Sequence, residues 1–235
     1  MSEQRTMASV AWMKRDALLL AATSFLILFL ELACIRYLPA QVRFFSYYTN
    51  FVLLAAFLGS GVGLVAPRRA RVLLALLPVA LVALVGLVLV LRNVVVAGPR
   101  SEFLWGIYSA PAPGAARLGV APTALLLFAA LTAVFIPLGA RLGELFGRFP
   151  ALDAYGYDIA GALAGIAAFA ALSRAGAPPL VWFAVVFVLA AVIAHDVRGR
   201  AACAVAGLVV LAALAQAREP GERWSPYYRI TVYPD

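Results

Sequence analysis

Two long apolar runs near the start of the chain constrain its fold more than any other feature. One is DALLLAATSFLILFLELACIRYL at 16–38, and the other is YTNFVLLAAFLGSGVGLVAP at 48–67, with a short aromatic and cationic turn between them. At about 1.5 Å of helix rise per residue, each run can cross a hydrocarbon core of about 30 Å. The chain is therefore expected to begin as a membrane hairpin.

The composition extends this interpretation to the whole chain. Hydrophobic residues make up 65% of it and charged residues 13%, whereas a soluble domain has an apolar share nearer one half. The net charge of +8 comes almost entirely from arginines at the ends of apolar runs, so it indicates topology rather than nucleic-acid binding. We expect an integral membrane protein whose surroundings are the lipid bilayer.

The apolar runs predict an all-α membrane protein, a polytopic bundle of about seven transmembrane helices with a short C-terminal extended tail. Six spans is the alternative, because the seventh run is short. Residues 98–121 contain several prolines around EFLWGIY and are expected to form a long loop that dips into the headgroup layer. The helical domain is expected over 1–217, the tail over 218–235, and the spans at about 16–38, 48–66, 72–96, 122–142, 155–172, 178–194 and 201–216.

Lysine and arginine counts predict the orientation in the cell membrane. With the N-terminus in the cytoplasm, ten of these residues lie on the inner side and six on the outer side before the tail, which favours a cytoplasmic N-terminus. An odd number of spans then places the tail outside. The inner residues are Arg5, Lys14, Arg15, Arg68, Arg69, Arg71, Arg141, Arg148, Arg198 and Arg200, and the outer ones are Arg36, Arg43, Arg92, Arg100, Arg117 and Arg174.

The two cysteines and the single histidine do not predict a metal or cofactor site. Cys34 and Cys203 lie in separate apolar runs, without a second thiol or a histidine at ligand spacing, so buried free thiols are expected. His195 follows the sixth run and is interpreted as a residue at the membrane interface. We expect no metal and no cofactor.

Small residues recur every four positions on three of the predicted helices. This spacing creates a flat groove on one helix face and lets two backbones approach closely in lipid, so these glycines are expected to pack helices together. They are Gly59 with Gly63, Gly139 with Gly143 and Gly147, and Gly161 with Gly165.

Glu31 and Arg36 lie inside the first apolar run. An ionisable group there costs about 3 kcal/mol on insertion scales unless it is paired or near the interface. Arg36 can extend to the interface, whereas Glu31 needs a partner elsewhere, with Arg43, Asn50 or the outer loop as candidates. Glu31 is either a structural polar contact or a substrate or proton site.

Asp158 lies one turn into the fifth run, close in sequence to Arg141, Glu144 and Tyr155. The helix dipole favours an acid in a first turn, so capping or an ion pair with Arg141 is the structural interpretation. The functional alternative makes Asp158, Tyr155 and Arg141 candidates for substrate-binding or polar residues within the membrane, together with Glu31 and Arg36.

The tail has the period-2 pattern of a β-strand. Tyr228, Ile230 and Val232 alternate with Arg229 and Thr231 in WSPYYRITVYPD. Because one strand cannot satisfy its own backbone, we expect this strand to pair with something outside the chain. The tail residues expected to face a partner are Trp224, Pro226, Tyr227 and Tyr228.

Three stretches resemble the membrane-bound spermidine synthase-like proteins, in which a multi-span module precedes a cytoplasmic aminopropyltransferase domain. The stretches are ELACIRYLPAQVRFFSYYTNFVLLAAFLGSGVGL at 31–64, IPLGARLGELFGRFPALDAYGYDIAGALAGIAAFAALSRAGAPPLVWF at 136–183, and RWSPYYRITVY at 223–233. The last is similar to the start of the first hairpin of that catalytic domain. The donor-binding turn and paired aspartates of that domain are not found in this sequence, so it carries no visible catalytic machinery.

The resemblance implies a role in polyamine biosynthesis at the bacterial inner membrane. The chain is then a module that anchors or serves an aminopropyltransferase domain or subunit supplied elsewhere. The alternative is a small transporter or channel-like bundle for a cation such as a polyamine, with Glu31 and Asp158 as polar stations. A membrane enzyme of other chemistry is less favoured, because the sequence shows no nucleophile–base pair or metal cluster.

Overall fold

The computed structural model describes residues 2–42, 49–92, 95–97 and 117–232. In this part of the chain there are seven α-helices and two small two-stranded sheets, which confirms the predicted all-α bundle. A short 3₁₀ turn, Pro67–Arg69, separates the second and third helices. The helices are α1 (Ser2–Gln41), α2 (Thr49–Leu64), α3 (Ala70–Leu91), α5 (Val120–Phe146), α6 (Ala151–Arg174), α7 (Pro179–Ile193) and α8 (Val197–Gln216).

Five segments are long and apolar enough to cross a membrane. They are Trp12–Gln41, Pro67–Leu91, Val120–Phe146, Ala151–Arg174 and Val197–Gln216. The α8 segment is among the five, although its short apolar run made it the weakest of the seven predicted spans. The two shorter apolar helices are α2, with 16 residues, and α7, with 15 residues.

Local chemistry explains where the last helices begin and end. Gly176 has a φ of 69°, a left-handed conformation that glycine adopts without steric cost, and it follows α6 directly. Pro179 begins α7 at a position where its missing N–H is not needed. The Asp196 carboxylate caps α8 by accepting the N–H of Gly199 at 2.7 Å.

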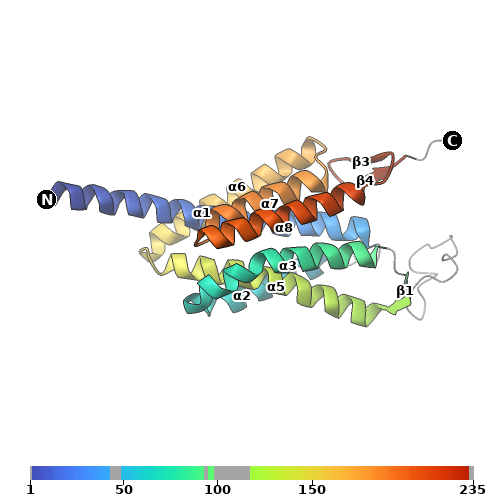
Figure 1. The fold of residues 1–235 in the computed structure, drawn as a ribbon, viewed down its shortest axis with the longest axis horizontal. Coiled ribbons are helices and arrows are strands. Elements are labelled where there is room, and N and C mark those ends of the chain that lie inside the picture. Colours follow the sequence, from blue (N-terminus) through green and yellow to red (C-terminus); the bar gives the residue numbers. More distant parts are fainter. Residues whose placement is uncertain (1, 43–48, 93–94, 98–116, 233–235) are drawn as a thin grey trace.

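The helices pack in two groups, as Figure 1 shows. In one group, α5 lies against α2 and α3; in the other, α1 lies against α6 and α7, and α7 lies against α8. Contacts of α3 with α8 and of α1 with α5 join the two groups. The long axes of the helices run roughly together.

Glycines bring two helix pairs into backbone contact. A β-carbon at Gly59 would lie 2.5 Å from the carbonyl oxygen of Thr132, and one at Gly165 would lie 2.5 Å from that of Phe25. Gly63 and Gly143 of the α2–α5 pair also lie against backbone of the opposite helix, and so do Gly139 and Gly161. The predicted groove residues therefore lie at the α2–α5 and α1–α6 contacts, whereas Gly147 lies near backbone of α5 alone.

The C-terminal residues form a hairpin instead of a lone strand. β3 (Glu222–Trp224) pairs antiparallel with β4 (Arg229–Thr231), and the Ser225 N–H donates to the Tyr228 carbonyl at 3.0 Å. The prediction that this strand must pair outside the chain is therefore wrong. Ser225 and Pro226 lie in the connection between the strands, so the stretch is strand, turn and strand.

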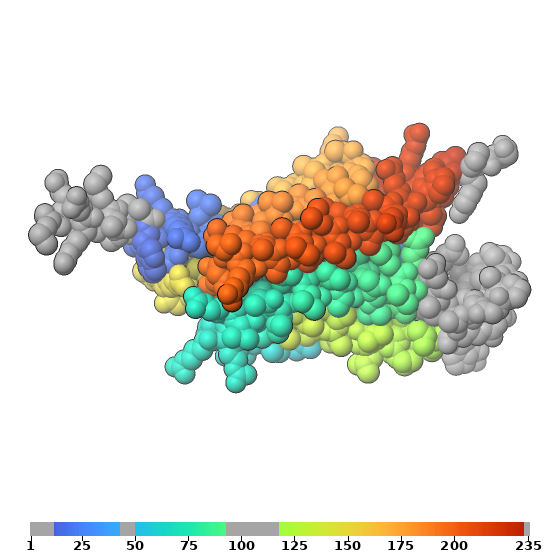
Figure 2. Space-filling model, in the orientation of Figure 1, coloured from blue at the N-terminus to red at the C-terminus, as the bar shows by residue number. Residues whose placement is uncertain are grey.

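The predicted loop at 98–121 lies mostly outside the described residues. At its two ends, β1 (Val95–Ala97) pairs in parallel with β2 (Arg117–Gly119). Figure 2 shows the first coloured part of α1, in blue, and the β3–β4 hairpin, in red, at opposite ends of the molecule. We call the end where the described part of α1 begins the basic end, and the other the hairpin end.

Candidate functional site

The basic end carries a chain of ion pairs centred on Glu144, near the C-terminus of α5. Arg141 Nη1 donates to Glu144 Oε2 at 2.7 Å, and Arg148 Nη2 donates to Glu144 Oε1 at 2.6 Å. Arg148 also donates from Nη1 to Asp16 Oδ2 of α1 at 2.9 Å. Because Arg141 is only 3% exposed, its charge depends on this carboxylate for compensation.

His195 joins the cluster from the turn between α7 and α8. Its Nε2 lies 3.1 Å from Glu144 Oε2 and 3.3 Å from Arg141 Nη1. Burial lowers the pKa of His195, and so do the charges of Arg141, Arg71 and Arg148, while Glu144 raises it; the net direction is down. The imidazole is therefore neutral at neutral pH and belongs to a partly buried polar network.

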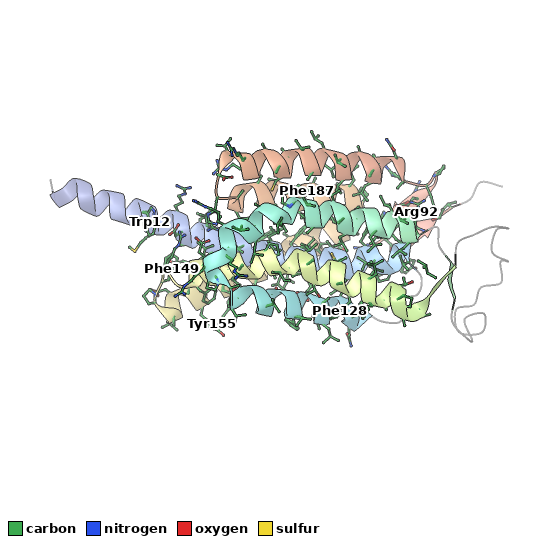
Figure 3. The ribbon with its side chains drawn as sticks, turned by 60° about the horizontal axis from the view of Figure 1, so that its bottom comes forward. Trp12, Arg92, Phe128, Phe149, Tyr155 and Phe187 are labelled. Atoms are coloured by element: carbon green, nitrogen blue, oxygen red, sulfur yellow. The ribbon has the colours of Figure 1, made fainter. Side chains whose placement is uncertain are left out.

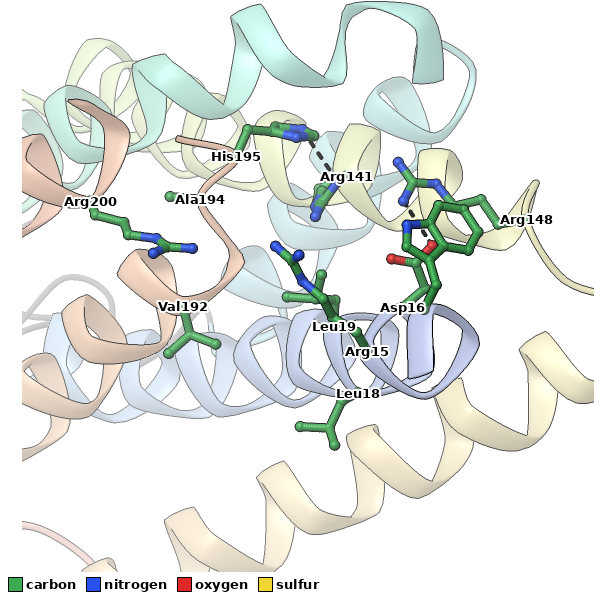
Figure 4. A pocket seen from close by; sticks show the side chains of 11 residues that line it. Arg15, Asp16, Leu18, Leu19, Arg141, Arg148, Val192, Ala194, His195 and Arg200 are labelled. Carbon is green, nitrogen blue, oxygen red and sulfur yellow. Dashed lines mark hydrogen bonds and ion pairs between the residues drawn. The ribbon is translucent and has the colours of Figure 1, made fainter. Parts of the chain in front are cut away.

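A pocket of about 440 Å³ opens beside this cluster, between α1, α5, the α7–α8 turn and α8. Its apolar walls include Leu18, Leu19 and Val192. Figure 4 shows the guanidinium groups of Arg15, Arg141 and Arg200 directed toward the same space. We call it the basic pocket, and its charged or titratable members are Arg15, Asp16, Arg141, Arg148, His195 and Arg200.

Aromatic side chains surround the basic end. Figure 3 places Trp12, Phe149 and Tyr155 there and Arg92 at the hairpin end. The Arg148 guanidinium lies 5.7 Å from the centroid of the Trp12 ring. Tryptophan and tyrosine are enriched at the level of lipid headgroups, so these positions fit a membrane boundary at this end.

At the hairpin end, Arg36 of α1 lies against two tryptophan rings that also contact each other. Its guanidinium carbon is 5.0 Å from the Trp182 ring centroid on α7 and 5.6 Å from that of Trp224 on β3. Arg36 Nη2 also donates to the carbonyl of Ser225. We call the side chains of Arg36, Trp182 and Trp224 the Arg36 clamp. Arg36 thus attaches the hairpin to the bundle instead of extending into solvent.

Further contacts hold the hairpin against the helices. The indole N–H of Trp224 donates to Glu222 Oε1 at 2.7 Å, and both side chains are buried. Ser173 Oγ of α6 donates to the carbonyl of Pro226 at 3.2 Å, and Arg92 Nη1 of α3 donates to the carbonyl of Ala217 at 2.7 Å. Of the predicted partner-facing residues, Trp224 therefore faces the bundle, while Pro226, Tyr227 and Tyr228 are exposed.

The acidic candidates within the spans lie apart from the basic pocket. Ser24 Oγ donates to Asp158 Oδ1 at 2.5 Å, so Asp158 joins α6 to α1 and does not pair with Arg141, contrary to prediction. The side chain of Tyr155 is exposed and contacts the Phe146 ring, with the centroids 6.1 Å apart. Among the described residues, no contact therefore joins Asp158 or Tyr155 to Arg141.

Glu31 is buried in α1 and makes no hydrogen bond or ion pair with another described residue. Of its predicted partners, Arg43 and most of the outer loop lie outside the described residues, and Asn50 is exposed at the start of α2. The basic pocket was missed because its arginines come from four segments and are each ordinary helix-end residues in the sequence. The number of arginines expected at this end of the bundle was the sequence signal that could have found the pocket.

Within the described ranges, no group of three or more histidine, cysteine, aspartate or glutamate residues is placed to hold a metal ion. Cys34 and Cys203 are buried free thiols. No protein-family model, curated protein or solved structure matches this chain. The assignment as a membrane bundle therefore rests on the length and apolar composition of the helices themselves.

Proposed function

We propose that this chain is a multi-pass module of the bacterial inner membrane that anchors or serves an aminopropyltransferase-like domain through the β3–β4 hairpin. The observation that carries the proposal is the Arg36 clamp together with the exposed outer side of the hairpin. Trp224 and Glu222 are buried against the bundle, while Tyr227, Tyr228 and Val232 are exposed. This hairpin is fixed to the bundle on one side and exposes apolar side chains on the other. It can therefore hold a neighbouring domain in a fixed position relative to the bundle.

The exposed outer side suits association with a water-side domain. A two-stranded hairpin is marginally stable alone and gains from adding strands or packing partners. Aromatic side chains supply large contact areas and are enriched among residues that dominate binding energy. The resemblance of 223–233 to the first hairpin of an aminopropyltransferase domain supports this class of partner.

Photocrosslinking in native membranes tests the proposal. A photoreactive amino acid at Tyr227 is compared with one at Leu152, because both side chains are 85% exposed but lie at opposite ends of the bundle. We expect a crosslinked polypeptide with an aminopropyltransferase sequence, identified by mass spectrometry, from Tyr227 and not from Leu152. Equal crosslinking at both positions, or no such polypeptide at Tyr227, contradicts the proposal.

The orientation of the bundle gives a second test. Before the tail, ten basic residues against six favour a cytoplasmic N-terminus, but the hairpin end also holds Arg218, Arg223 and Arg229, which makes the count ten against nine. The cytoplasmic N-terminus stays a prediction and puts the hairpin outside, whereas a cytoplasmic catalytic domain needs it inside. Alkaline phosphatase fused after Asp235 distinguishes the two, because an active reporter excludes a cytoplasmic partner domain.

Transport of a cation such as a polyamine stays the alternative. It rests on Glu31 and Asp158, which no contact among the described residues connects. The basic pocket gives it no support, because cationic side chains line that pocket.

A further inference from the structure

The basic pocket has more positive charge than its own carboxylates neutralise. Four arginines line it, while Asp16 and the adjacent Glu144 are the acids bonded to them, and His195 is neutral. This leaves a net charge of about +2 in a concave space. Arg15 and Arg200 make no side-chain hydrogen bond or ion pair with another described residue, so both are available to an anion.

Arg141 is the buried arginine among the four that line the pocket. Its side chain is almost fully enclosed, and its Nε has no hydrogen-bond partner within the described structure. A buried guanidinium nitrogen without an acceptor is costly, and arginine donors match the oxygens of phosphate groups. The pocket therefore fits an anion that accepts several hydrogen bonds at once.

The aliphatic walls of the pocket indicate which kind of chemical group is attached to that anion. Leu18 of α1 is 71% exposed and Val192 of α7 is 48% exposed, and both line the pocket beside the arginines. The pocket lies at the basic end, where the Arg148 guanidinium contacts the Trp12 ring and where Figure 3 also places Tyr155. Positive charge at the membrane boundary next to exposed aliphatic side chains suits an amphiphile.

We propose that the basic pocket binds the phosphate of an anionic phospholipid, held by Arg15, Arg141 and Arg200, with an acyl chain along Leu18 and Val192. A soluble phosphate compound would use the same arginines but leave these aliphatic side chains uncovered. The lipid covers both parts of the pocket. The inference is independent of the hairpin and its partner, because it concerns the opposite end of the bundle.

Lipid titration of the full-length chain tests this inference. The protein is purified in a neutral detergent, depleted of lipid, and mixed with phosphatidylglycerol, with phosphatidylcholine of the same acyl chains, or with inorganic phosphate. Unfolding is followed with a thiol-reactive dye, and retained lipid is counted by native mass spectrometry. We expect phosphatidylglycerol alone to raise the melting temperature and to remain bound at a fixed stoichiometry.

The variants separate the pocket from general surface charge. Arg15→Gln with Arg200→Gln removes two exposed pocket arginines, and Arg68→Gln with Arg198→Gln removes two exposed arginines of the same end that do not line the pocket. An arginine near an anionic headgroup contributes about 1 kcal/mol, or roughly fivefold, so the first pair is expected to weaken binding about 25-fold. The second pair is expected to change it by less than about twofold.

Three results overturn the proposal. One is equal stabilisation by phosphatidylcholine, which means that any bilayer lipid suffices. Another is equal stabilisation by inorganic phosphate, which identifies a soluble anion as the ligand. The third is equal loss of binding in the two double variants, which means that the pocket contributes nothing beyond surface charge. If the first double variant is less stable without lipid, the mass-spectrometric count still decides the outcome.

Discussion

Replacing Gly63 by alanine tests whether the bundle depends on backbone contact between α2 and α5. A β-carbon at Gly63 would lie 2.6 Å from the backbone nitrogen of Ala140 and 2.9 Å from the carbonyl carbon of Gly139. Both atoms are backbone, so no side chain can rotate away, and α2 must move from α5 by about 1 Å. The matched control is Gly61→Ala on the same helix, where a β-carbon meets nothing within 4 Å.

The cost follows from the loss of packing. A gap of about 0.5–1 Å forfeits about a quarter to a half of the dispersion attraction across a contact, and overpacking costs about 1–3 kcal/mol in well-packed interiors. Packing drives helix association in lipid, so we expect Gly63→Ala to lose about 2–3 kcal/mol of stability. Gly61→Ala is expected to gain about 0.5–1 kcal/mol, because alanine has the higher helix propensity.

The two buried thiols make the measurement direct. Cys34 in α1 and Cys203 in α8 are inaccessible in the folded bundle, so a thiol-reactive dye reports unfolding. At about 2–4 °C per kcal/mol for a chain of this size, Gly63→Ala should melt about 4–12 °C below the parent protein, and Gly61→Ala at or slightly above it. If Gly63→Ala melts with or above the control, close backbone approach does not stabilise this bundle.

Three further perturbations have defined outcomes. Trp224→Ala should release the hairpin and speed tryptic cleavage at its arginines severalfold, whereas Tyr227→Ala should leave the cleavage rate unchanged. Because the pKa of His195 is below its ordinary value of 6.5, the unfolded chain binds that proton more readily; the melting temperature should fall as pH drops through 6.5, and less so in His195→Gln. Glu144→Gln should cost about 3 kcal/mol by leaving a buried arginine uncompensated, and Asp153→Asn, at an exposed acid, less than about 0.5 kcal/mol in the same melt.

Hydropathy predicted the bundle because the helices are apolar along most of their length, both where they face other helices and where they are exposed. Pro178 also marked the start of the sixth predicted span within one residue of the observed start of α7, since proline restricts the backbone locally. These features depend on neighbouring residues, so one sequence contains them. The hairpin was missed although Ser225 and Pro226, a common turn pair, interrupt the alternation in the tail.

The polar contacts depend on how helices meet, which a single sequence does not encode locally. Arg36 was expected to extend to the interface, but the approach of α7 and β3 places two indole rings against it. Asp158 was expected near Arg141, yet α6 turns it toward Ser24 of α1. The basic pocket likewise needs the ends of four segments to converge.

The contact of α1 with α6 has a consequence for biogenesis. Ala21 lies opposite Gly161 and Phe25 opposite Gly165, so the two helices run in the same direction. The Ser24–Asp158 bond joins residues 134 positions apart. During synthesis, the first helix therefore leaves the ribosome long before its principal neighbour exists. The face of α1 that carries Ala21 and Ser24 therefore has no α6 to pack against until residues 151–174 are made, and α7 and α8 join the bundle later still.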